Sequence, residues 1–140
     1  MKLTLNRIIA VAALALALAV AVAATAQTQQ PTNCATARVT LTSSALKAGD
    51  EMTATVAVEN CSTEKESLFV QYSYTDPCGE TTEMSKESLK LKAGEKQDAH
   101  LTFLAPSAAG CAGSFKVNAS ILGGGRELVK ASAPFSVKAQ

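Results

Sequence analysis

The feature that most constrains the fold of this chain is an alternation of apolar and polar side chains with a period of two residues. In the segment 51–60, EMTATVAVEN, Met52, Ala54, Val56 and Val58 fall on one face, while two threonines and a glutamate fall on the other. The same pattern recurs in the segments 66–75, 97–106, 114–122 and 128–139. A period of two is typical of a β-strand with one buried face, and no stretch after residue 26 has a sustained helical period. The pattern predicts an all-β fold.

The number of these segments and the turn signals between them favour a sandwich. A first strand is expected at 37–42, and the sequence DPCGE at 76–80 is a strong turn signal. The segment 44–50 is interpreted as a turn, and the polar segment 81–96 as a poor edge strand followed by a turn. About seven short strands predict an antiparallel β-sandwich. An up-and-down barrel is the alternative, although eight-stranded barrels usually need a longer chain.

The N-terminal segment has the three-part layout of a secretory signal peptide. Lys2 and Arg7 make a positive start, an apolar run follows at 8–24, and small residues lead up to a cleavage position after Ala26. We therefore expect a signal peptide helix at 1–26, removed on export. An uncleaved membrane anchor is the alternative, but the run is mostly alanine and its transfer into lipid is weakly favourable.

The exported part is long enough for one domain. Removing 26 of the 140 residues leaves 114, which we divide into a flexible tail at 27–35 and one β-sandwich domain at 36–140. Cleavage also removes two of the 13 basic residues and leaves 11 against 12 acidic ones. Such a balance predicts no nucleic-acid partner and no membrane association of the mature form. The signal peptide predicts a periplasmic or secreted location.

The chain has four cysteines, and all of them lie in the exported part: Cys34, Cys61, Cys78 and Cys111. An even number of cysteines in an oxidising compartment predicts two disulfides, for which three connectivities are possible. No two cysteines are close in sequence, whereas structural zinc sites usually take their ligands in close pairs. The cysteines therefore do not indicate a metal site.

Several short motifs resemble those of a known family. They are Ala48-Gly49-Asp50, Val58-Glu59-Asn60, Ala93-Gly94-Glu95 and the Pro106 that follows a strand. Over about 46–137 the chain resembles the immunoglobulin-like β-sandwich domains of bacterial surface and periplasmic proteins, of the cell-adhesion-related type. It departs from that pattern by having four cysteines, and Cys61-Ser62 where the family usually has a glycine. The resemblance implies a fold, and a role in adhesion by analogy only.

The immunoglobulin-like topology implies a disulfide pairing. In such a sandwich the start of the first strand and the loop after the second strand lie at one end, whereas the loop after the third strand and the start of the sixth lie at the other. This arrangement pairs Cys34 with Cys61 and Cys78 with Cys111. Other pairings would have to bridge the length of a strand, roughly 20 Å, against a usual Cα separation of about 5.5–6 Å.

Residues that could carry catalysis or bind metal are scattered. His100 is the only histidine and is expected to face solvent, and no serine or cysteine has a nucleophile signature. The soft ligands Met52, Met84 and His100 fall on three different strands. Carboxylates near one another in sequence, such as Glu64 and Glu66 or Glu80 and Glu83, are interpreted as solvated surface. We therefore predict no catalytic residue, no metal site and no cofactor.

One loop is a candidate binding site. Gly123, Gly124, Gly125 and Arg126 form a glycine-rich segment that is not followed by a helix, which a phosphate-binding loop would need. We interpret it as a flexible hairpin loop at one end of the sandwich, where binding residues are often found, with Arg126 as the contact candidate.

The sequence alone thus favours an exported, non-enzymatic immunoglobulin-like domain with an interaction or structural role. Its partner would be an unidentified protein or glycan. The alternative is a periplasmic carrier of a metal or small-molecule ligand.

Overall fold

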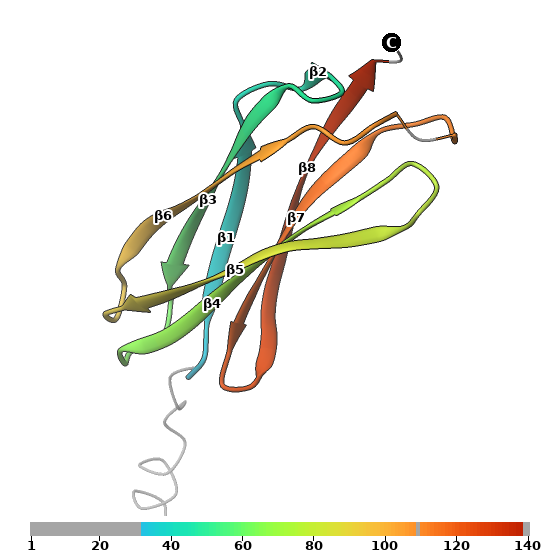
Figure 1. Ribbon diagram of the computed structural model, residues 1–140. Helices are drawn as coiled ribbons and strands as arrows, with labels where there is room; N and C mark the ends of the chain where they lie inside the picture. The colour runs from blue at the N-terminus through green and yellow to red at the C-terminus, as the bar shows by residue number, and fades with distance from the viewer. Residues whose placement is uncertain (1–31, 109, 139–140) are drawn as a thin grey trace, which may run out of the picture. The chain divides into compact units, whose positions relative to one another are not determined.

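Two β-sheets make up the part of the chain that the computed structural model describes, residues 32–108 and 110–138. The strands are β1 (Ala35–Leu41), β2 (Ala45–Lys47), β3 (Glu51–Asn60), β4 (Glu66–Thr75), β5 (Thr81–Leu91), β6 (Lys96–Leu104), β7 (Phe115–Gly123) and β8 (Arg126–Lys138). One sheet has the order β1-β3-β6 and the other β2-β8-β7-β4-β5 (Figure 1). The predicted all-β sandwich is therefore confirmed, with eight strands rather than about seven.

The core lies between the two sheets and is built from the alternating residues. Met52, Val56 and Val58 of β3 are buried, and so are their counterparts on the facing strands β4 and β7. Phe115 and Phe135 stack with their ring centroids 5.2 Å apart. Because every second side chain of each strand points inward, the apolar face predicted from the sequence is the face that loses contact with water.

The segment 44–50, predicted as a turn, contains the short strand β2. This strand pairs in parallel with β8, and Leu46 at its centre is buried. The chain thus leaves the smaller sheet after β1 and adds three residues to the edge of the larger sheet. The prediction was wrong for 45–47, because three residues are too few to show a period of two. The turn predicted at 48–50 is present, and the N–H of Asp50 donates to the carbonyl of Lys47.

The polar segment 81–91 forms β5, an edge strand eleven residues long. Only Leu89 and Leu91 of this strand are fully buried, which agrees with its polar composition. An irregularity in the pairing between Tyr72 and Ser73 of β4 leaves Met84 without a direct partner. Edge strands are often marked by such charges and bulges, which discourage pairing with other chains.

The structure contains two disulfides, Cys34–Cys61 and Cys78–Cys111, with Cα separations of 5.0 Å and 5.3 Å. The first joins the residue before β1 to the residue after β3. The second joins the turn between β4 and β5 to the loop between β6 and β7. Each bond thus ties together segments that are distant in sequence.

Asn60, the last residue of β3, is fully buried and connects three segments. Its amide nitrogen donates to the carbonyl oxygens of Glu64, Leu91 and Lys92, at 2.8, 3.1 and 3.1 Å. Its amide oxygen accepts from the backbone N–H and the hydroxyl of Ser62. These bonds hold the loop after β3 against the turn between β5 and β6.

The expected signal peptide and the alternative membrane anchor lie outside the described residues. Within the described residues, no helix has the length and apolar character needed to cross a membrane. β1 begins at Ala35, inside the range that the sequence assigns to the tail.

Candidate functional site

The glycine-rich segment forms the hairpin between β7 and β8. Gly123 ends β7, Arg126 begins β8 opposite it, and Gly124 and Gly125 form the turn between them. Both turn glycines have positive φ, at 60° and 77°. Two consecutive positive φ angles are typical of a type I′ hairpin turn, whose twist matches that of the flanking strands. The hairpin expected from the sequence is therefore present, and its glycines form a tight two-residue turn.

Close packing also leaves little room for a side chain at the base and tip of this hairpin. A Cβ on the buried Gly123 would lie 2.8 Å from a methyl carbon of Leu68 and 2.9 Å from one of Leu128. A Cβ on Gly124 would lie 2.8 Å from the amide nitrogen of Asn33. The hairpin tip thus packs against the residue that precedes Cys34.

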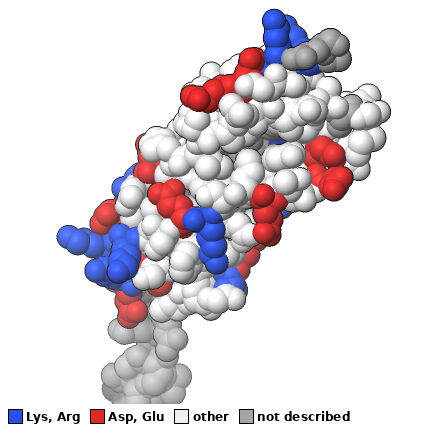
Figure 2. Space-filling model, viewed as in Figure 1, with Lys and Arg blue, Asp and Glu red and all other residues white. Residues whose placement is uncertain are grey.

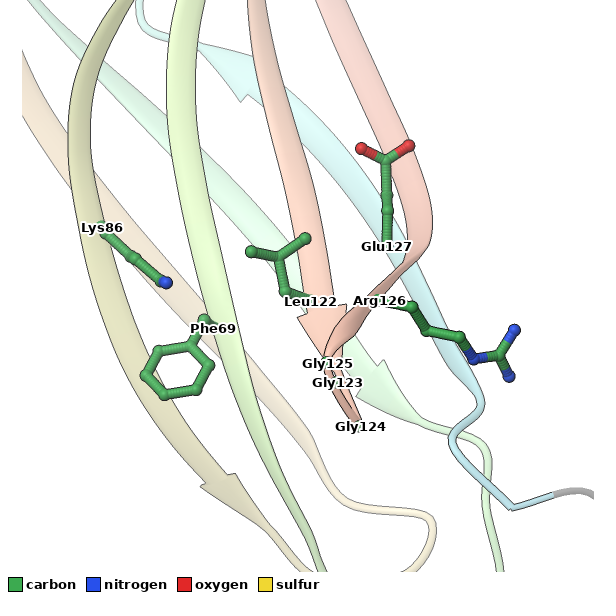
Figure 3. Close-up of a pocket in the computed structure, with 8 residues that line it drawn as sticks. All are labelled: Phe69, Lys86, Leu122, Gly123, Gly124, Gly125, Arg126 and Glu127. Atoms are coloured by element: carbon green, nitrogen blue, oxygen red, sulfur yellow. The ribbon is translucent and has the colours of Figure 1, made fainter.

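A pocket of about 340 Å³ opens beside the hairpin on the outer face of the larger sheet (Figure 3). It is lined by Phe69, Lys86, Leu122, Gly123, Gly124, Gly125, Arg126 and Glu127. Phe69 points outward from β4 and lies opposite Leu122 of β7. Because the glycines next to Leu122 have no side chains, the two apolar groups remain accessible from the hairpin side.

Phe69 is one of only two large apolar side chains that the described residues expose, with 39% of its surface accessible. The amino group of Lys86 lies 4.6 Å from the centre of its ring, an arrangement that permits a cation–π attraction. Glu127 lies on the other side of the pocket, and Arg126 points away from Phe69 (Figure 3). The pocket therefore combines an apolar floor with charged groups at its rim.

On one face of the molecule, the charged groups outside the pocket form no single-sign surface. Figure 2 shows acidic and basic side chains interspersed over one face of the molecule, with basic groups gathered where β5 leads into β6. The one ion pair found in the described residues joins Lys96 and Glu59 at 3.7 Å, and it is exposed. This face therefore does not select a partner by bulk charge.

The other residues singled out from the sequence do not come together as a site. Met52 is buried in β3, Met84 lies on β5 in the other sheet, and His100 is exposed on β6. The nearest side-chain partner of His100 is the hydroxyl of Thr55, 3.1 Å from Nδ1. In residues 32–108 and 110–138, no three histidine, cysteine, aspartate or glutamate side chains are placed to hold a metal ion.

Tyr72 is buried in the core. Tyr74 is partly buried and packs against the core. The pKa of Tyr72 is raised to about 12. The largest cause is burial of the side chain, followed by the negative charge of Glu87 and the hydrogen bond to that residue. Tyr72 therefore stays neutral at physiological pH and donates to the Glu87 carboxylate. Within the described residues, neither Tyr72 nor Glu87 belongs to a group of three histidine, cysteine, aspartate or glutamate side chains that could hold a metal ion.

No protein-family model and no curated protein matches this chain. Solved structures of similar fold include the CARDB domain of the PF1109 protein from Pyrococcus furiosus, a structure that holds di-metal ions. It is 13% identical, with a TM-score of 0.61, and the match covers 81% of this chain and 99% of that one. CARDB domains are the cell-adhesion-related immunoglobulin-like type that the sequence resembles, and at this identity the likeness concerns the fold.

Two longer proteins match over part of their length. A β-glucosidase from Erythrobacter marinus is 14% identical with a TM-score of 0.59, and the match covers 74% of this chain and 15% of the enzyme. The sporulation control protein Spo0M from Bacillus subtilis is 17% identical with a TM-score of 0.55, and the match covers 78% of this chain and 51% of that protein. This chain thus spans a minor part of the enzyme and about half of Spo0M.

Proposed function

We propose that this protein is an exported, non-enzymatic binding domain, and that the pocket beside the β7–β8 hairpin contacts a protein or glycan partner. The observation that carries the proposal is the exposed ring of Phe69 above an accessible Leu122, with Lys86 and Glu127 at the rim. Apolar contact at the centre with polar groups around it is the usual composition of a recognition surface. The likeness to a CARDB domain supports a role in interaction rather than catalysis.

The pocket is tested by comparing two substitutions of exposed apolar residues. Phe69→Ser removes the central contact and is expected to weaken partner binding about thirtyfold, because a central aromatic residue often contributes 2 kcal/mol or more. Leu104→Ser is the matched control, since Leu104 is the other large exposed apolar residue of the described part and ends β6 in the opposite sheet. Binding is measured by surface plasmon resonance against the partner captured from envelope extract or identified on a glycan array.

Equal losses for the two variants, or no loss for Phe69→Ser, would contradict the proposed pocket. Native mass spectrometry of the same preparation addresses the carrier alternative. A stable added mass on the purified protein would favour a bound metal or small molecule over a macromolecular partner.

Export is the second part of the proposal and rests on the three-part N-terminus and the two disulfides. We expect the protein recovered from the periplasm or medium to begin at Gln27. N-terminal sequencing measures this directly, and a chain that begins at Met1 and stays with the membrane fraction would support the anchor instead. Fusion of the first 26 residues to a leaderless reporter enzyme is the control, and it should export the reporter.

A further inference from the structure

The four outer strands of the two sheets differ in how well their free edges are protected against pairing with another strand. β2 has only three residues, and β5 has a bulge and charged side chains along its length. β1 carries Arg38 at its centre and leads directly into the crossover to the other sheet. Shortness, charges and bulges are the devices by which natural sheets avoid edge-to-edge association.

β6 lacks these devices over most of its length. Among the described strands only β3 pairs with it, and their ladder is regular from Glu51–Leu104 to Glu59–Lys96. The segment Ala99–Ala105, AHLTFLA, contains no proline, glycine, lysine, arginine, aspartate or glutamate. An uncharged, regular edge of this length is a template for strand addition.

The inward face of β6 is also incompletely covered. Ala99 is buried, but Leu101 and Phe103, which point to the same side, are only partly buried against the core. Another strand beside β6 would place its own inward side chains next to Leu101 and Phe103. Strand addition at this edge would therefore bury apolar surface as well as satisfy backbone groups.

We propose that a second copy of this chain pairs with β6 in antiparallel orientation, about a twofold axis through Leu101. In this register Leu101 lies opposite Leu101 of the second copy, and the small Ala99 lies opposite the large Phe103. On the outer face His100 lies opposite Thr102 of the second copy, and no two like charges are opposed. A register centred on His100 would instead place Phe103 opposite the polar Gln97.

The corresponding pairing of β5 is unfavourable. A twofold axis through Lys86 or Glu87 would place two like charges directly opposite each other, which is destabilising between strands. Pairing of two β5 strands in these central registers is thus opposed by charge, whereas β6 is complementary to itself. The inference is independent of the proposed binding pocket, which lies on the larger sheet and includes no residue of β6.

The test uses the protein purified after expression of the full chain, and sedimentation equilibrium over a range of concentrations. The wild type is expected to show a monomer–dimer equilibrium. In the double variant His100→Lys with Thr102→Lys, the lysine at 100 of each copy faces the lysine at 102 of the other copy. The repulsion between these ammonium groups should weaken the dimer. His100→Lys with Thr102→Glu places opposite charges there, and its dimer dissociation constant should be about tenfold lower than that of the first double variant.

The matched control is Thr53→Lys with Thr55→Lys, which adds the same charge to the same rows on the interior strand β3. Thr53 pairs with Thr102 and Thr55 with His100, so the control differs only in its distance from the free edge. This control variant should have the same dimer dissociation constant as the wild type. A wild type that stays monomeric at every concentration, or equal dissociation constants for the two β6 double variants, would overturn the inference.

Discussion

Replacing Asn60 with alanine is expected to lower the free energy of unfolding by about 3 kcal/mol. The substitution removes five hydrogen bonds at a fully buried position and leaves the carbonyl oxygens of Leu91 and Lys92 without their side-chain donor. The carbonyl of Lys92 keeps its bond from the N–H of Glu95, but the buried carbonyl of Leu91 loses its side-chain donor and remains desolvated, which costs more than the net value of one hydrogen bond. Urea unfolding monitored by circular dichroism measures the loss.

Asn118→Ala is the matched control for this prediction. Asn118 is also buried, but its partners are the hydroxyls of Ser73, Thr75 and Ser132. A hydroxyl can rotate toward water or another acceptor, whereas a carbonyl fixed at the end of a strand cannot. We expect a loss of only about 1 kcal/mol, the usual net value of a hydrogen bond. Equal losses at the two positions would show that the backbone partners of Asn60 do not add to the loss in the free energy of unfolding.

Asn60→Asp separates the donor from the acceptor function. The carboxylate keeps the acceptor toward Ser62 but would face the three carbonyl oxygens that the amide nitrogen now contacts. Its pKa should therefore rise on folding, so the variant should become more stable relative to wild type as the pH is lowered toward 4. A variant whose relative stability does not depend on pH would contradict this account.

The sequence predicts those parts of the fold that depend on local periodicity. The alternation in 51–60 identified the buried face of β3 because each inward residue is two positions from the next. β2 was not predicted because its burial depends on pairing with β8, about 90 residues later. The network of Asn60 depends likewise on the carbonyls of residues 91 and 92, which no local pattern connects to it.

The candidate site was predicted only in part, for the same reason. The glycines of the hairpin are conspicuous in the sequence, but Phe69 is one outward residue in a strand of alternating side chains. Its importance comes from lying opposite Leu122, which is known only once the register of β4 and β7 is known. An aromatic residue at an outward strand position is the signal that could have suggested it, since such positions are usually polar.

Tryptic mapping without reduction can establish the disulfides in solution. The sequence has a lysine or arginine between each successive pair of cysteines, so trypsin separates all four into different peptides. The structure requires crosslinked peptides for Cys34–Cys61 and Cys78–Cys111. A Cys34–Cys111 or Cys61–Cys78 crosslink would be incompatible with this strand topology.

Removing either disulfide by double alanine substitution should lower the free energy of unfolding by about 3.5 kcal/mol. The bonds close loops of similar length, with sequence separations of 27 and 33 residues. In the chain-entropy treatment these lengths change the stabilisation by only about 0.2 kcal/mol, because the dependence on length is logarithmic. Urea unfolding should therefore give nearly equal losses for Cys34→Ala with Cys61→Ala and for Cys78→Ala with Cys111→Ala.

The local consequences of the two double substitutions should nevertheless differ. The Cys34–Cys61 bond lies beside a regular ladder, in which Ala35 pairs with Asn60 and the N–H of Cys61 donates to the carbonyl of Cys34. That ladder remains when the sulfurs are removed. By contrast, the described residues supply no backbone hydrogen bond between the turn at 76–80 and the loop that holds Cys111.

Limited proteolysis of the folded variants should therefore cut the segment 105–114 only after loss of Cys78–Cys111, since cleavage requires local opening. Cutting there after loss of Cys34–Cys61 alone would mean that the far end of the sandwich depends on the anchoring of β1.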